Sequence, residues 1–259
     1  MSNSIIFSKK KFLQDGFCIF DFNKDLLKGV KKKIIRLISN TLSKKYNLQK
    51  TSEKKIISLY KSKYKKDIIN SLNHIGFFPE LFSFVNERKI INIIKEIGLK
   101  FPVAGFNNLG GRGGLPFLYS FPNDKKRYYQ PHQDFFYLPY SQNSITLWIP
   151  LQSTSKLNGA LKVIPKSHLK FKLYNHSAKD VKFNKLNKNF SENEFKTINV
   201  KLGQALIFSS FLVHKSGSNS SNQIRMSFNV RFNDLFDKEY IERGLSFDKF
   251  PDNKLIKKF

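Results

Sequence analysis

Two histidines and one aspartate have the residue types and the spacing of a metal site. His132 and Asp134 are separated by one residue, and His214 follows in a later apolar segment. Alternate side chains of an extended strand project to the same face, so His132 and Asp134 can bind one ion together. Two imidazoles and one carboxylate form a facial triad that leaves half of an octahedral ion open, as in non-haem Fe(II) oxygenases. The pattern predicts an iron site with His214 as the third ligand.

The other histidines near structured segments are assigned differently. His168 is the alternative third ligand, but it follows Pro165 and Ser167 at an expected junction between strand and loop. A capping role is favoured at such a junction. His74 lies in an apolar context and is interpreted as a helix-end or core histidine.

A second feature is a segment that alternates strictly between apolar and polar residues. It predicts a strand with two unlike faces, made up of Met226, Phe228, Val230 and Phe232 on one side and Arg225, Ser227, Asn229 and Arg231 on the other. A guanidinium presents a bidentate fork to a carboxylate, so the polar face suits an acidic ligand. A strand with its polar face in water gives the same alternation. Trp148, the only tryptophan, fits either a core or a ligand site.

The elements that must position these residues divide the chain into two halves. Before residue 115, apolar residues recur every three or four positions, which predicts helices. These are expected at residues 8–15, 23–44, 55–72 and 87–97, with an apolar strand at 17–20. From there on, short apolar runs alternate with turn residues, which is typical of strands. The expected strands are Phe117–Phe121, Ser144–Leu151, Ala160–Ile164, Thr197–Val200, Ala205–Phe208 and Arg225–Phe232.

This rhythm predicts an antiparallel barrel or jelly roll with a helical layer packed on it. We expect one domain over 1–259, with mainly helical support at 1–114, a β core at 115–235 and a C-terminal tail at 236–259. Residues 168–196 are polar and rich in Lys and Asn, so they are interpreted as an insertion or loop. The Gly-rich run 110–114 lacks the spacing of a phosphate loop and is expected to be a turn or lid.

The net charge of the chain is extreme. Its 259 residues include 46 basic and 19 acidic side chains, for a formal charge of +27. Such a field attracts nucleic acid, anionic membranes or acidic substrates. However, only seven of the basic residues are Arg, and Lys is accompanied by abundant Asn, Ile and Phe, which an AT-rich coding bias would produce. Nucleic-acid binding is therefore a lesser alternative.

Cysteine content and hydropathy bear on location. Cys18 is the only cysteine, so no internal disulfide forms and a reducing compartment is favoured. The first residues do not resemble a signal peptide, and no run approaches the roughly 20 apolar residues of a membrane span. A cytoplasmic protein is expected.

Four blocks of the sequence resemble the phytanoyl-CoA dioxygenase family of Fe(II)/2-oxoglutarate oxygenases. They are Phe12–Phe17, His132–Asp134, Gly159–His168, and Leu202–Ala205 continuing to Arg225–Ser227. The resemblance implies a double-stranded β-helix with a cupin-like or jelly-roll core. It also implies iron held by the three residues named above, and 2-oxoglutarate chelating that iron. The far carboxylate of 2-oxoglutarate would be bound by Arg225 and Ser216, with Trp148 nearby and Ser227 as a weaker contact.

The resemblance also bears on the reaction. Relatives that chlorinate carry a small residue in place of the carboxylate ligand, so Asp134 implies oxygen chemistry with O2, most simply hydroxylation. Gln204 departs from an acid that is common in the family, at a position outside the expected metal shell. The expected pocket wall, with sheet core as the alternative role, is Phe135, Phe136, Tyr137 and Tyr140. Arg231 and Arg112 are expected to hold an acidic substrate.

The sequence therefore predicts an Fe(II)/2-oxoglutarate dioxygenase that hydroxylates a small, anionic metabolite, with neither a specific nucleic-acid partner nor a membrane span. The same iron chemistry could instead desaturate, epimerise or cyclise its substrate. A non-catalytic β-barrel binding protein is the alternative from another class. The sequence leaves the oligomeric state open.

Overall fold

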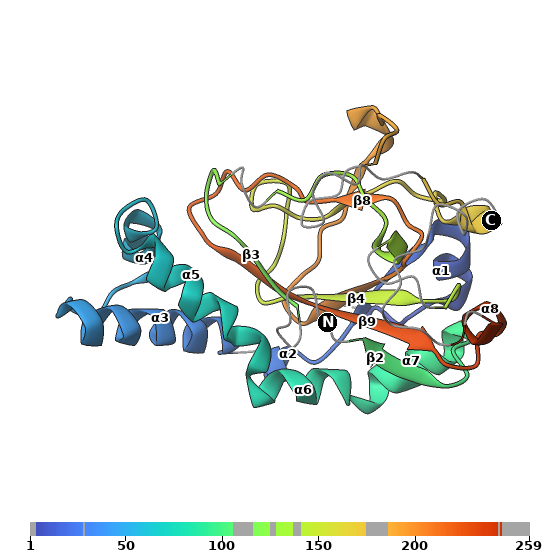
Figure 1. Cartoon of the computed structure of the whole chain (residues 1–259), viewed down its shortest axis with the longest axis horizontal. Coiled ribbons are helices and arrows are strands. Elements are labelled where there is room, and N and C mark those ends of the chain that lie inside the picture. Colours follow the sequence, from blue (N-terminus) through green and yellow to red (C-terminus); the bar gives the residue numbers. More distant parts are fainter. Residues whose placement is uncertain are drawn as a thin grey trace.

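The computed structural model describes residues 4–27, 29–105, 116–124, 128–136, 141–174, 186–242 and 244. Two antiparallel sheets form its centre (Figure 1). The larger sheet has the order β1-β7-β4-β9-β2, and β3 also pairs with β9. Its strands are β1 Phe17–Asp21, β2 Pro102–Gly105, β3 Phe117–Ser120, β4 Ile145–Pro150, β7 Gln204–Ser209 and β9 Arg225–Asp234.

The smaller sheet has the order β6-β5-β8. Its strands are short: β5 Lys162–Val163, β6 Lys196–Thr197 and β8 His214–Lys215. In Figure 1, β8 lies across from β4 and β9, on the side away from helices α6 and α7. The two sheets therefore face each other, with the helical layer behind the larger one.

Helices dominate the N-terminal part of the chain. They are α1 Lys9–Asp15, α2 Lys24–Leu27, α3 Val30–Tyr46, α4 Glu53–Leu59, α5 Lys65–Asn73, α6 Pro79–Val85 and α7 Arg88–Ile97, followed near the C-terminus by α8 Lys238–Glu242. Four described 3-10 turns complete the set: Ile75–Phe77, Asp134–Phe136, Leu169–Phe171 and Glu192–Glu194. None of the described helices is long and apolar enough to cross a bilayer.

Strand alternation divides the core into two layers. Leu147 of β4 belongs to the larger apolar cluster, which includes Ile94 of α7 and many other helical residues. The next residue, Trp148, belongs to a second cluster that contains Leu206 of β7 and Val163 of β5. Because neighbouring side chains of a strand point to opposite faces, the first cluster fills the space between helices and sheet, and the second lies between the two sheets. The larger sheet is buried on both sides.

Several expected elements have different boundaries. The helix predicted over 23–44 is interrupted at Gly29, which has a φ of 88° in the left-handed region, so α3 begins at Val30. The helix predicted over 55–72 is divided into α4 and α5. The sequence did not predict α6 or β2. Helix α7 ends before Gly98 as predicted, with a buried stripe of Ile90, Ile93, Ile94 and Ile97.

The predicted mixed fold, with helices packed on an antiparallel sheet, is confirmed. The expected strands at 117–121, 144–151, 205–208 and 225–232 correspond to β3, β4, β7 and β9. The expected strands at 160–164 and 197–200 are shorter in the structure, where they correspond to β5 and β6. The predicted insertion at 168–196 is described only at its two ends, and the Gly-rich run 110–114 lies outside the described residues.

Candidate metal centre

The two histidines of the predicted triad are joined through their backbones. The His132 N–H donates to the His214 carbonyl at 2.9 Å, and the His214 N–H donates to the His132 carbonyl at 3.0 Å. This isolated antiparallel bridge places the two imidazole centroids 4.2 Å apart. The smaller sheet therefore brings together two side chains that are far apart in the sequence.

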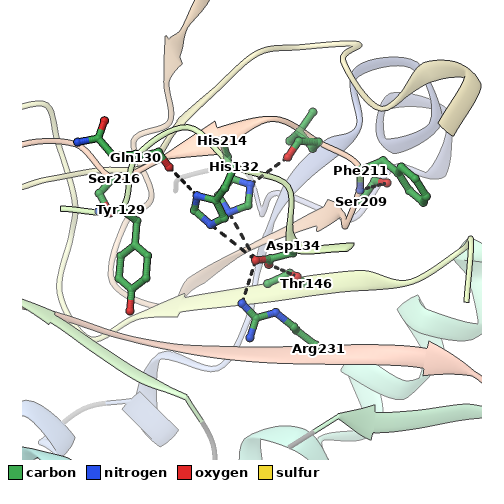
Figure 2. Close-up of polar contacts among 11 residues, drawn as sticks. Tyr129, Gln130, His132, Asp134, Thr146, Ser209, Phe211, His214, Ser216 and Arg231 are labelled. Carbon is green, nitrogen blue, oxygen red and sulfur yellow. Dashed lines mark hydrogen bonds and ion pairs between the residues drawn. The ribbon is translucent and has the colours of Figure 1, made fainter. Parts of the chain in front are cut away.

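The orientation of each imidazole is fixed by a nearby carbonyl. His132 Nδ1 lies 2.7 Å from the Gln130 carbonyl, and His214 Nδ1 lies 2.9 Å from the Leu212 carbonyl. A carbonyl can only accept, so each Nδ1 carries the proton and each Nε2 keeps a lone pair. Both Nε2 atoms face the Asp134 carboxylate in Figure 2. This is the tautomer that a metal-binding histidine needs.

Asp134 completes the cluster from a tight turn, and this corrects the expectation of an extended strand. Asp134 begins the 3-10 turn Asp134–Phe136, but its Oδ1 still lies 3.8 Å from His132 Nε2 and 3.9 Å from His214 Nε2. All three ligand atoms lie within 4.8 Å of one another, and all three residues are buried. The donor set is two imidazole nitrogens and one carboxylate oxygen, which suits Fe(II) with open positions.

Burial and nearby charge set the protonation of the cluster. Burial, followed by the neighbouring His214, lowers the pKa of His132 to about 3, and burial also lowers the pKa of His214. Burial by itself would raise the pKa of Asp134, but the Arg231 guanidinium and the two histidines outweigh it and hold that pKa below its usual range. At neutral pH the cluster therefore contains two neutral imidazoles and one carboxylate, the forms that bind a metal.

Two residues that the sequence did not place at the cluster hold the carboxylate. Thr146 of β4 donates from Oγ1 to Asp134 Oδ2 at 2.6 Å. Arg231 of β9, which we expected to hold substrate, donates from Nη2 to Asp134 Oδ1 at 2.9 Å. The alternation of β4 could have indicated Thr146, because it lies two residues before Trp148 and therefore on the same face.

Two of the residues expected to bind 2-oxoglutarate, Arg225 and Ser227, lie on the same side of β9. Arg225 is 3% exposed and donates from Nη1 to Ser227 Oγ at 3.0 Å. Burial lowers the pKa of Arg225 to about 10, so it remains charged at neutral pH. Ser216, two residues after His214, is buried and accepts from the Tyr129 N–H at 3.3 Å. Figure 2 shows Tyr129 and Ser216 on the flank of the histidine pair.

Trp148 is fully buried on the same inner face. The β4–β9 register places it opposite Asn229, two residues from Ser227. Trp148 Nε1 and Asn229 Oδ1 are buried without a hydrogen-bond partner among the described residues. Buried polar atoms normally find partners, so these two atoms point to a ligand in the space between the sheets.

The expected substrate wall is described only in part. Phe135 is buried and stacks on Phe211, with centroids 4.3 Å apart. The Phe135 N–H donates to the Ser210 carbonyl at 3.0 Å, so both the backbone and the ring of this residue brace the segment that leads to His214. The side chain of Phe136, and the whole of Tyr137, Tyr140 and Arg112, lie outside the described residues.

The remaining sequence expectations concern residues away from the cluster. His168 Nε2 lies 3.1 Å from the Leu13 carbonyl, near the end of α1. This histidine is not part of the metal cluster. His74 is the C-terminal cap of α5. Gln204 donates to Asp21 Oδ1 at 3.0 Å, in a contact between β7 and β1. It therefore stabilises strand pairing and does not contact the triad.

A family model agrees with the geometry. The model of the phytanoyl-CoA dioxygenase family (PhyH) matches residues 110–227. The matched region includes His132, Asp134 and His214, and also Arg225 and Ser216. The match confirms the resemblance seen in the sequence motifs, and it identifies this region as an iron- and 2-oxoglutarate-dependent oxygenase domain.

Among the solved structures with a similar fold, three share 13–16% sequence identity with this chain. The non-haem monooxygenase ThoJ in its apo form superposes with a TM-score of 0.58, at 16% identity, over 87% of this chain and 76% of that chain. The carbocyclase SnoK from nogalamycin biosynthesis, described as non-haem and alpha-ketoglutarate dependent, gives 0.54 at 16% identity, over 95% and 93%. EvdO2 from Micromonospora carbonacea var. aurantiaca complexed with 2-oxoglutarate gives 0.50 at 13% identity, over 90% and 93%. At these identities the likeness concerns the fold. No curated protein sequence matches the chain.

Proposed function

We propose that this protein is an Fe(II)/2-oxoglutarate-dependent dioxygenase that hydroxylates a small, anionic metabolite and converts 2-oxoglutarate to succinate and CO2. The observation that carries the proposal is the buried cluster of His132, Asp134 and His214, whose ligand atoms lie within 4.8 Å of one another. We further propose that the two facing sheets are a double-stranded β-helix, with the iron between them. We also propose that residues 1–259 form a single domain.

Each residue has a separate task in this proposal. His132, Asp134 and His214 would hold iron, which when bound supplies activation of O2. Arg225 would bind the far carboxylate of 2-oxoglutarate, because a buried guanidinium without an acidic partner among the described residues requires an anion. Ser216, Ser227 and Trp148 would line the same site. The protein thereby provides geometry, charge and exclusion of water.

The substrate is proposed to be acidic because of the charge of the chain. A formal charge of +27 raises the local concentration of anions around the protein. Phe135, Phe136, Tyr137 and Tyr140 follow the carboxylate ligand directly and are proposed to form the substrate wall. A metabolite with a carboxylate or phosphate and an apolar carbon skeleton fits both features.

A second candidate outcome is ring formation or another oxidation without net hydroxylation. The carbocyclase SnoK shares this fold over 95% of the present chain. The same metal ligands permit desaturation, epimerisation and cyclisation as well as hydroxylation. Mass analysis of the product separates hydroxylation, which adds one oxygen atom to the substrate, from desaturation or cyclisation, which removes two hydrogens. Epimerisation leaves the mass unchanged, and NMR of the product detects the changed configuration.

The first experiment is an anaerobic titration of the protein with Fe(II) and 2-oxoglutarate, followed by the charge-transfer absorbance of the complex. We expect a visible band in the wild type, no band in His214→Ala, and a weaker response to 2-oxoglutarate in Arg225→Ala. His168→Ala is the matched control, because this histidine lies outside the cluster. A folded wild type that gives no band would overturn the proposal.

The alternative of a non-catalytic binding protein is tested by release of succinate. We expect slow succinate formation in air with Fe(II) and 2-oxoglutarate alone, and faster formation with the correct substrate. A protein that binds Fe(II) and 2-oxoglutarate but forms no succinate with any acidic metabolite would favour the binding-protein alternative.

A further inference from the structure

The two oxygens of the Asp134 carboxylate have different partners. Oδ2 accepts from the Thr146 hydroxyl at 2.6 Å. Oδ1 accepts from the Arg231 guanidinium at 2.9 Å, and it is also the oxygen that lies 3.8 and 3.9 Å from the two histidine Nε2 atoms. Figure 2 shows the four side chains converging on this carboxylate. A metal bound by the histidines would therefore use the same oxygen that Arg231 contacts.

The positions of Thr146 and Arg231 are set by strand register. The two residues are direct partners across β4 and β9, and side chains of directly opposite residues point to the same face of a sheet. Both strands lie in the interior of the larger sheet: β4 pairs with β7 and β9, and β9 pairs with β4, β2 and β3. The carboxylate is therefore held by a rigid element instead of by its own short turn.

The metal ligand Asp134 already has a cationic partner. Asp134 and Arg231 form a buried ion pair, with side-chain exposures of 0% and 10%. A divalent metal entering beside Oδ1 meets one negative and one positive charge. Two cations close together in a buried site repel each other strongly.

We propose that Arg231 is a positioning residue for the metal ligand Asp134: it compensates the carboxylate charge before the metal binds, then shares Oδ1 with the metal and lowers its affinity. This inference rests on the proposed iron site. Thr146 keeps Oδ2 occupied, so Asp134 presents a single oxygen to the metal and the remaining coordination positions stay open for the co-substrate. The arrangement gives a preformed site whose affinity for divalent metals is held down.

The test measures by calorimetry the binding of Mn(II) to the metal-free protein, because Mn(II) binds without being oxidised. Arg231→Gln removes the charge and keeps a hydrogen-bond donor, and we expect its Kd for Mn(II) to fall at least about tenfold below that of the wild type. Arg231→Lys keeps the charge and should stay within about threefold of the wild type. Arg36→Gln, at an exposed position of α3, is the control, and it should leave the Kd unchanged, because this arginine lies outside the metal cluster.

A second measurement protects the test against loss of folding in Arg231→Gln. Each single variant, Arg231→Gln or Asp134→Asn, leaves one buried charge uncompensated, so the metal-free melting temperature should fall by more than about 4 °C in each. The double variant has neither charge, so its decrease in melting temperature should be smaller than the sum of the decreases in the two single variants. Additive losses, or an Mn(II) Kd in Arg231→Gln equal to or above the wild-type value, would overturn the inference while leaving the iron site intact. A wild type that binds no Mn(II) would overturn the proposed function as well.

Discussion

Gln133 donates from Nε2 to the Phe211 carbonyl at 2.7 Å, and so ties the residue between two metal ligands to the segment that leads into His214. The same Nε2 donates to the Lys172 carbonyl at 2.7 Å, and Oε1 accepts from the Tyr174 N–H at 2.9 Å. Gln133 is fully buried. These contacts fix the backbone beside the metal cluster.

Gln133→Leu should destabilise the metal-free protein. Leucine fills a similar volume but leaves two carbonyls and one N–H without their partner, and each buried polar group so orphaned costs about 1–3 kcal/mol. Only the contact with Phe211 is fully buried, and the other two are part-buried and cost less, so we expect the free energy of unfolding in urea to fall by about 2–5 kcal/mol. Gln223→Leu, at an exposed position, should change it by less than about 0.5 kcal/mol. Equal stabilities of the two variants would show that the Gln133 contacts are not needed.

Arg225→Met should weaken the stabilisation of the protein by 2-oxoglutarate. The buried guanidinium has no ion pair with any described residue, so binding of a dicarboxylate supplies the missing charge. In the Mn(II)-loaded wild type we expect 2-oxoglutarate to raise the melting temperature. In Arg225→Met its Kd should rise about 10- to 100-fold, which corresponds to the loss of a charge-assisted hydrogen bond. Arg36→Met, on the exposed face of α3, is the control; an unchanged Kd in Arg225→Met would refute the assignment.

Thr146→Val should separate metal binding from co-substrate binding. Valine has the shape of threonine but cannot donate, so Asp134 Oδ2 loses its partner, and metal-free stability should fall by about 1–3 kcal/mol. The released oxygen can then chelate the metal, which occupies a position that 2-oxoglutarate needs. We expect calorimetry to give an undiminished Mn(II) affinity and a weakened 2-oxoglutarate affinity. Thr41→Val, which removes a hydroxyl bonded to the Leu37 carbonyl, should affect neither.

Glu192 should make a small contribution to stability that depends on pH. Hydrogen bonds from Lys162 and then Lys215 lower the pKa of this carboxyl from 4.5 to about 2. A depressed carboxyl pKa stabilises the fold above the unfolded value, and this stability is lost as pH falls through the folded value. Relative to Glu192→Gln, the wild-type advantage should therefore be full above pH 4.5 and vanish towards pH 2.

The size of the Glu192 effect is limited by its exposure. The side chain is 61% exposed, so solvent screening keeps the difference at pH 7 below about 1 kcal/mol. Unfolding curves of both proteins between pH 2 and 7 at low salt provide the measurement, and high salt should reduce the difference. Glu96→Gln, on the exposed side of α7, serves as the control. A pH-independent difference would contradict the assigned pairing with Lys162 and Lys215.

Gly16→Ala should lower the stability of the fold by more than an ordinary Gly→Ala substitution does. Gly16 has a φ of 85°, and an added Cβ would lie 2.5 Å from His168 Nδ1 and 2.8 Å from Leu212 Cδ1. Left-handed backbone by itself costs about 1–2 kcal/mol for a residue with a Cβ. Gly29, with a φ of 88° and no atom within 4 Å of an added Cβ, gives the matched control. Thermal unfolding should show Gly16→Ala less stable than Gly29→Ala by about 1–3 kcal/mol; equal losses would mean that His168 and Leu212 move aside freely.

Much of the candidate site follows from the sequence, because the relevant patterns are local. The spacing of His132 and Asp134, and the alternation of β9 from Arg225 to Arg231, are visible in short stretches of chain. So are the apolar stripe of α7 and its end before Gly98. Periodicity within one element requires no knowledge of its neighbours.

The contacts that complete the site depended on the tertiary structure. The pairing of Arg231 and Thr146 on the Asp134 carboxylate follows from the register between β4 and β9. Likewise, the bridge between His132 and His214 and the clamp made by Gln133 join segments distant in sequence. Register is decided by which side chains fit together across strands and in the packed layers on either side. That fit is a property of the whole fold, so alternation could assign Arg231 to a face of its strand but could not identify the carboxylate it contacts.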